Sequence, residues 1–193
     1  MKHTMVIYRS NMVIWKTIAT GSSGNCYLLQ NGDKKILIEA GIKMPAIKKA
    51  LDFDFSGLEA CFITHEHGDH ACSAKHLAKA GVNIYASAGT FSKLEIVNKK
   101  RCKILSHGCK PARVAGFSIT PFNTEHDAEE PLGFLIEHLS SGEKILFATD
   151  TYTLRWIFHD INFWFLECNY KLDILEKNIM MHDLPEIMKK VKW

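Results

Sequence analysis

Three histidines and one aspartate fall within six consecutive residues of this chain, in the run His-Glu-His-Gly-Asp-His at residues 65–70. An apolar tetrapeptide that is typical of a buried strand precedes this run by one residue. Alternate residues of an extended chain point the same way, so His65 and His67 can reach one ion. Asp69 and His70 stand where a helix would begin and can face a second ion close by.

Imidazole and carboxylate donors together suit Zn²⁺, Mn²⁺ or Fe²⁺. Two more candidate ligands follow apolar, strand-like segments: His126 comes after residues 117–122, and Asp150 after residues 144–148. Sheets commonly carry their sites beyond the ends of their strands. Taken alone, His126 or Asp150 would more often be an ordinary loop residue. The alternative for the run at 65–70, a His-rich surface loop, is disfavoured because so dense a cluster after an apolar strand is a strong signal of a metal site. Taken together, they predict a two-metal centre and hence a hydrolase.

The bulk composition fits one soluble domain. A length of 193 residues suffices for a sizeable core, and the net charge of +3 is compatible with an anionic substrate without indicating one. Six cysteines without C-x-x-C spacing indicate buried thiols in a reducing compartment. No apolar run approaches the roughly 18 residues of a membrane span, and no secretory signal is visible. The sequence therefore predicts a cytoplasmic protein.

Apolar runs bounded by turn signals alternate with helix-like segments. Strands are expected at residues 12–19, 26–30, 34–39, 60–64, 83–86, 117–121, 132–138, 144–148 and 162–167. Helices are expected at residues 45–51, 71–80, 90–98 with Thr90 as its cap, 172–179 and 184–191. Asn31-Gly32-Asp33 predicts a hairpin turn. This order predicts an α/β (α+β) fold of mixed sheets covered by helices, in one domain over residues 12–193 after a lead-in at 1–11.

Several motifs together resemble the metallo-β-lactamase superfamily and, more narrowly, its YycJ/WalJ-type branch. Besides the His-rich run they are Gly-Ser-Ser-Gly-Asn at residues 21–25, Pro-Phe-Asn-Thr-Glu-His-Asp-Ala at 121–128, Glu-Pro-Leu-Gly-Phe at 130–134 and Ala-Thr-Asp-Thr at 148–151. The resemblance covers about residues 12 to 180. It implies a four-layer αββα sandwich with two divalent metal ions, zinc before manganese or iron. The branch is described as metal-dependent hydrolases, with exonuclease activity on DNA.

The resemblance also implies a role for each candidate residue. The first metal would bind His65, His67 and His126, the second would bind Asp69 and His70, and Asp150 would bridge both. A metal-bound hydroxide would be the nucleophile, with Asp69, Asp150 and Asp127 as catalytic residues. Asp127 and Glu66 are candidates to hold imidazoles by their free N–H groups.

Two features depart from the family pattern. Glu39 stands where the family has a supporting aspartate, which is one methylene shorter. The family's last histidine has no counterpart at its usual place; His182 is the better substitute and His159 the weaker, while His107 and His138 are expected at the surface. We therefore expect a chain truncated or diverged at its C-terminal end, in which the first metal site fills readily and the second is weak.

Three functions remain open from the sequence. The first is a phosphodiesterase, namely an exonuclease with DNA as its substrate. The second is a small-molecule hydrolase of the same fold, acting on a thioester, lactone or cyclic phosphodiester. The third is a metal-binding protein with little activity. The sequence shows no aromatic-plus-basic stripe of the kind that nucleic-acid-binding proteins carry, and the turn at residues 21–25 either contacts a phosphate or sugar or is a plain hairpin turn.

Overall fold

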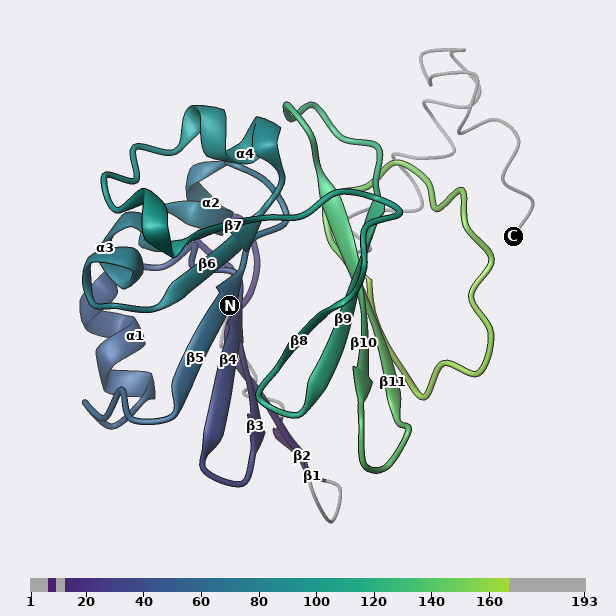
Figure 1. The fold of residues 1–193 in the computed structure, drawn as a ribbon, viewed down its shortest axis with the longest axis horizontal. Helices are drawn as coiled ribbons and strands as arrows, with labels where there is room; N and C mark the ends of the chain where they lie inside the picture. Colours follow the sequence, from purple (N-terminus) through teal and green to yellow (C-terminus); the bar gives the residue numbers. More distant parts are fainter. Residues whose placement is uncertain (1–6, 10–12, 167–193) are drawn as a thin grey trace, which may run out of the picture.

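Two β-sheets packed face to face form the framework of the protein (Figure 1). The computed structural model describes residues 7–9 and 13–166. In these residues the first sheet consists, in spatial order, of β1 (Ile7–Arg9), β2 (Val13–Ala19), β3 (Cys26–Asn31), β4 (Lys34–Ile38), β5 (Leu58–Phe62), β6 (Asn83–Ala86) and β7 (Cys102–Ile104). The second consists of β12 (Phe163–Leu166), β11 (Lys144–Ala148), β10 (Leu132–His138), β9 (Phe117–Asn123) and β8 (Ala112–Val114).

The strands β4 to β7 run parallel, whereas β1 to β4 pair in antiparallel fashion. Parallel neighbours need crossover connections, and the helices stand in these connections: α1 (Met44–Ala50), α2 (Gly68–Ala71), α3 (Ala74–Lys79) and α4 (Ala88–Lys93). Figure 1 shows them together on the outer side of the first sheet. The carboxyl ends of β4 to β7 therefore meet at one edge, where the His-rich run begins.

Central strands of the first sheet are apolar on both faces. Leu37 and Cys61 belong to the core on the helix side. Ile36, Ile38 and Phe62 belong to the core between the sheets. This is the period of two that a pleated strand imposes, with both faces buried. It explains why the sequence of these strands reads as a continuous apolar run.

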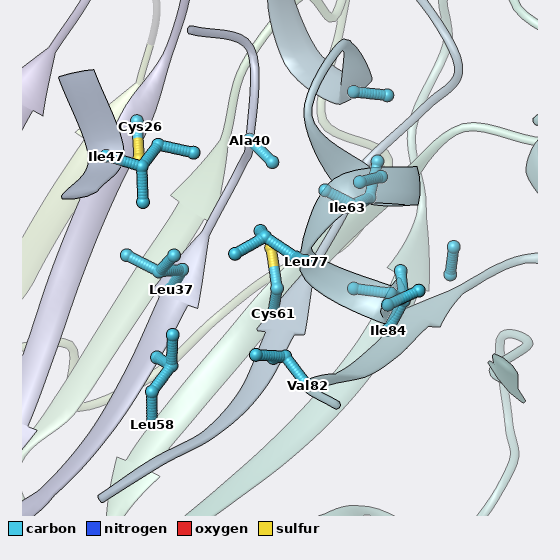
Figure 2. Packing of buried hydrophobic residues seen from close by; sticks show 14 of the residues in the cluster. Cys26, Leu37, Ala40, Ile47, Leu58, Cys61, Ile63, Leu77, Val82 and Ile84 are labelled. Atoms are coloured by element: carbon cyan, nitrogen blue, oxygen red, sulfur yellow. The ribbon is translucent and has the colours of Figure 1, made fainter. Parts of the chain in front are cut away.

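The two cores differ in the kind of side chain they contain. On the helix side, Ile47 of α1 and Leu77 of α3 belong to a cluster of mostly aliphatic residues with two cysteines (Figure 2). Between the sheets the large rings gather, and those that are fully buried are Trp15, Phe62, Phe117, Phe134 and Phe147. Aromatic side chains bury the most surface per residue, so the core between the sheets buries more apolar surface per residue than the core on the helix side.

The mixed α/β fold with two sheets is confirmed, and the predicted hairpin joins β3 to β4. Two details of the predicted helices are wrong. The helix expected at 71–80 begins at Gly68 and is divided into α2 and α3. The helix expected at 90–98 is capped by Ser87, whose hydroxyl accepts the Thr90 N–H at 3.0 Å, and it ends at Lys93. Ser is as good a cap as Thr, and Ser87 lies one turn earlier.

Three strands were not predicted: β1, β7 and β8. Each has three residues, too few for an alternating pattern to stand out. The expected helices at 172–179 and 184–191 lie outside the described residues. Within the described ranges, no helix is both long enough and apolar enough to cross a membrane.

Candidate metal centre

Three loops, each following a strand, bring the candidate ligands together. The run at residues 65–70 leaves β5 and enters α2, whose first turn contains Asp69 and His70. His126 follows β9, and Asp150 follows β11. Because β5 belongs to the first sheet and β9 and β11 to the second, the donors come from both sheets.

The imidazoles of His65, His67 and His126 converge on one point. His67 Nδ1 lies 3.1 Å from His65 Nε2 and 3.2 Å from His126 Nε2. Zinc–nitrogen bonds at tetrahedral angles would space the ligand nitrogens by about 3.3 Å. The three nitrogens therefore fit a metal ion, and they are the first set of ligands predicted from the sequence.

The carboxylate of Asp150 stands between this set and a second one. Asp150 Oδ2 lies 2.6 Å from His70 Nε2 and 3.9 Å from His65 Nε2. Asp69 Oδ2 lies 3.5 Å from the same His70 nitrogen. Donor atoms of His65, His70 and Asp150 all lie within 4.8 Å of one another. The structure thus brings all six predicted ligands together.

The two buried histidines His65 and His70 have opposite pKa shifts. Burial lowers the pKa of His65 to about 3, and the neighbouring imidazoles act in the same direction. Burial also acts to lower the pKa of His70, but hydrogen bonds with Asp150 and Glu39 outweigh it and raise the pKa to about 10. His65 is therefore a neutral donor, whereas His70 holds a proton beside Asp150 and Glu39. An ion at the second set has to replace that proton.

Glu39 lies behind His70, in the supporting place expected for the family's aspartate. Its side chain is completely buried, and its Oε1 lies 3.5 Å from His70 Nδ1. The same oxygen accepts the backbone N–H of Thr64 at 3.3 Å. Burial raises the pKa of the Glu39 carboxyl, although hydrogen bonds from His70 and Thr64 oppose this. The longer side chain therefore still reaches the imidazole.

Two other side chains contact imidazole nitrogens that face away from the donor sets. Asp127 Oδ1 lies 3.0 Å from His126 Nδ1, as predicted. Thr64 Oγ1 lies 2.9 Å from His65 Nδ1. The contact of Thr64 was not predicted, although its place directly before the His-rich run is the signal that could have found it. Such contacts fix the orientation of a metal-binding ring.

Two predictions about polar residues are wrong. Among the described residues Glu66 contacts no imidazole; its carboxylate accepts the backbone N–H of Glu129 at 2.8 Å. His138 is not at the surface but only 2% exposed, because the hydroxyls of Ser140 and Ser141 lie 3.1 and 2.9 Å from its ring nitrogens and satisfy them. Of the two substitutes for the missing histidine, His182 lies outside the described residues. The other, His159, is exposed and in neither donor set.

The Gly-Ser-Ser-Gly-Asn turn packs against the start of α2. Asn25 Oδ1 accepts the Gly21 N–H at 3.0 Å, which pins the turn. The backbone N–H of Asn25 donates to Asp69 O at 2.7 Å, and the side-chain Nδ2 of Asn25 lies 3.2 Å from His70 Nε2. The turn is thus a structural support for two predicted ligands. A contact between its exposed serines and a phosphate or sugar stays a prediction.

Two packed sheets with histidine and carboxylate donors at the ends of their strands define a class of metal-binding sandwich. The chain belongs to the beta-lactamase superfamily domain family, which residues 34–183 match. The fold resembles a metallo-β-lactamase from Cronobacter sakazakii with a TM-score of 0.63 at 14% identity, over 89% of this chain and 82% of that one.

Two relatives place the chain nearer to one branch of this family, as the sequence motifs predicted. It is 28% identical over 175 residues to exodeoxyribonuclease WalJ of Streptococcus pneumoniae serotype 2 (strain D39). It is 25% identical over 172 residues to exodeoxyribonuclease YycJ of Bacillus anthracis. Each match covers 83% of this chain and 64% of the relative. The chain therefore spans less than two thirds of the length of these relatives.

Proposed function

We propose that this domain is a metal-dependent phosphodiesterase that acts on DNA as an exonuclease. The observation that carries the proposal is the place of Asp150, whose carboxylate lies within reach of both histidine sets. A carboxylate in that position suits a pair of ions better than a single one. The two relatives named exodeoxyribonuclease support DNA as the substrate.

The residues present fit two divalent ions, of which zinc is our first choice because imidazole nitrogens dominate the donors. His65, His67 and His126 would hold one ion, Asp69 and His70 the other, and Asp150 both. Bound ions of this kind supply an activated water near neutral pH and polarise the phosphoryl group.

The surrounding residues set the protonation state of the donors and fix the orientation of their rings. Burial keeps His65 unprotonated. Asp127 contacts the outer nitrogen of His126, and Glu39 that of His70, so both are positioning residues. The partly exposed side of the site, at His67 and Asp69, is the side from which a substrate can approach.

The test is DNA cleavage by variants of the full chain. We expect the metal-dependent rate of Asp150→Asn to fall by more than about 100-fold, and that of His67→Ala likewise. Loss of a residue that only orients a ligand already lowers metal affinity by about 10- to 100-fold, and loss of a ligand itself should cost more. Asparagine tolerates the left-handed backbone of Asp150, whose φ is 49°. Asp160→Asn is the matched control, since Asp160 lies exposed in the same loop with φ 56°.

Unchanged cleavage in both ligand variants would show that the site is wrongly assigned. Cleavage of a thioester or lactone without any cleavage of DNA would overturn the phosphodiesterase and favour a small-molecule hydrolase. A nuclease should also lose activity steeply as salt rises, because phosphate contacts release counterions.

We expect the two ions to bind with different affinities. Three imidazoles surround the first position, whereas the second has one imidazole, Asp69 and a share of Asp150. The proton that the raised pKa of His70 keeps on its ring also competes with the second ion. Metal content measured at limiting and at excess zinc should therefore approach one and then two ions per chain. Two ions bound equally tightly would contradict this expectation.

A further inference from the structure

Aromatic side chains stand exposed beside the candidate metal centre, on the loop that follows β11. Tyr152 is 51% exposed, and its ring centroid lies 6.1 Å from that of His126. Four residues later, Trp156 is 41% exposed. Leaving such rings in water forgoes the stabilisation that burial would give, which points to a binding role.

Polar contacts hold these rings at a fixed place relative to the ligand His126. The Tyr152 N–H donates to Glu125 O at 2.9 Å, and the Trp156 indole N–H donates to Asn123 O at 3.3 Å. Arg155, which directly precedes Trp156 in the sequence, forms an ion pair with Glu125. The aromatic loop is thus fastened to the segment that carries the metal ligand.

A basic stretch of chain, which runs from the first sheet to the second, meets this loop. Residues 96–124 contain no Asp or Glu, but they contain Lys99, Lys100, Arg101, Lys103, Lys110 and Arg113. All but Arg101 are exposed, and none of the six forms an ion pair with a carboxylate in the described part of the chain. We call residues 99–113 the basic segment.

The aromatic loop and the basic segment touch through stacked rings. His107, in the middle of the basic segment, stacks on Trp156 with centroids 4.4 Å apart and planes at 28°. In Figure 1 the basic segment runs from β7, at the edge of the first sheet, across to β8, at the edge of the second. The aromatic loop and the basic segment are far apart in the sequence, which is why the sequence shows no stripe that combines aromatic and basic residues.

We propose that Tyr152, Trp156 and His107 form a stacking platform for the bases of single-stranded DNA, and that the basic segment binds the phosphates of the same strand. Aromatic faces accept any base, and lysine and arginine neutralise phosphates without reading sequence. The arrangement leads a strand end to the metal centre. This inference rests on the proposed function and adds to it the surface that holds the substrate.

The first experiment measures binding without cleavage. The full chain, with chelator present, is titrated against a fluorescent oligothymidylate of about 15 nucleotides. Trp156→Ala should weaken binding roughly 5- to 100-fold, the range for loss of one stacked base. Trp156→Phe should restore most of the affinity. The matched control is Trp164→Ala, a tryptophan of β12 that is 52% exposed and outside the platform.

An abasic strand of equal length separates stacking from attraction to phosphates. On this strand Trp156→Ala should bind as the unaltered chain does. Equal binding of the thymidylate by Trp156→Ala and Trp164→Ala would overturn the platform. So would an equal loss on the abasic and the thymidylate strands.

The second experiment measures the salt dependence of binding. The triple variant Lys103→Gln, Lys110→Gln and Arg113→Gln should reduce the slope of log affinity against log salt by about 2, since each phosphate contact on a single strand contributes about 0.7. The control removes the same charge from exposed lysines at α1: Lys43→Gln, Lys48→Gln and Lys49→Gln. Equal slopes for both triple variants would overturn the role of the basic segment.

Failure of the proposed function would look different. It would appear as absence of metal-dependent hydrolysis of bis(4-nitrophenyl) phosphate by the unaltered chain, whatever the binding result. Hydrolysis of that ester together with unaltered DNA binding in every variant would overturn the platform alone.

Discussion

At the scale of single residues, the main departure from the family pattern is a longer acid in a buried place. Glu39 has a backbone φ of 66°, in the left-handed region, at the end of β4. That conformation is costly for a residue with a side chain, and Asp150 adopts it too. Two of the few such residues in the described chain therefore lie at the candidate centre, where strain commonly accompanies function.

We expect Glu39→Gln to weaken metal binding at the His70 position by about 10- to 100-fold, because an amide is a weaker partner for the outer imidazole N–H. The measurement is a zinc titration of the metal-free protein against a competing chelator dye. Glu66→Gln is the matched control, since the Glu66 carboxylate contacts the Glu129 N–H and not a ring. A similar loss in both variants would show that Glu39 has no positioning role.

At the scale of elements, the candidate centre depends on how closely the β4–α1 connection approaches α2. A Cβ added to Gly41 would lie 1.6 Å from the backbone oxygen of Asp69. The neighbouring Ala40 N–H donates to His70 O at 2.8 Å, and the Gly41 N–H to Asn25 O at 2.8 Å. Two connections, β2–β3 and β4–α1, thus pack around the short helix that carries two predicted ligands.

Gly41→Ala should therefore destabilise the metal-free domain by about 1–3 kcal/mol, the usual cost of overpacking, and should displace Asp69 and His70. Urea unfolding followed by circular dichroism measures the first effect, and zinc titration the second. In Gly68→Ala the added methyl would meet nothing within 4 Å, so this variant should stay close to the unaltered chain. Retention of full stability by Gly41→Ala would contradict the packing argument.

Most strands could be predicted because the hydrophobic pattern of the sequence and the positions of the metal-binding residue types point to the same strand ends. Apolar runs mark the central strands, and the ligands stand at their ends. What could not be predicted has no clear signal in the sequence: the local contacts of Ser87 with Thr90 and of His138 with two serine hydroxyls, and the tertiary pairing that forms the edge strands β7 and β8. The stacking of His107 on Trp156 is of the same kind.

At the scale of the whole molecule, each sheet supplies part of the donor set. The first gives His65, His67, Asp69 and His70, and the second gives His126 and Asp150. A bound ion should therefore stabilise the fold, by about 2.7 kcal/mol at a free concentration 100 times its dissociation constant. Thermal unfolding with zinc and with chelator measures this. An equal melting temperature in both would show that no ion links the sheets.

Because the donors are divided between the two sheets, they become available at different times while the chain is synthesised. Domains form as the chain leaves the ribosome, N-terminal part first, at roughly 5–20 residues per second. On the order of ten seconds therefore separate the synthesis of His65 from that of Asp150. A nascent chain that has made only the first sheet carries an incomplete set of ligands. Binding of a metal ion that uses donors from both sheets would thus be a late step of biogenesis, and it would report that the two sheets have met.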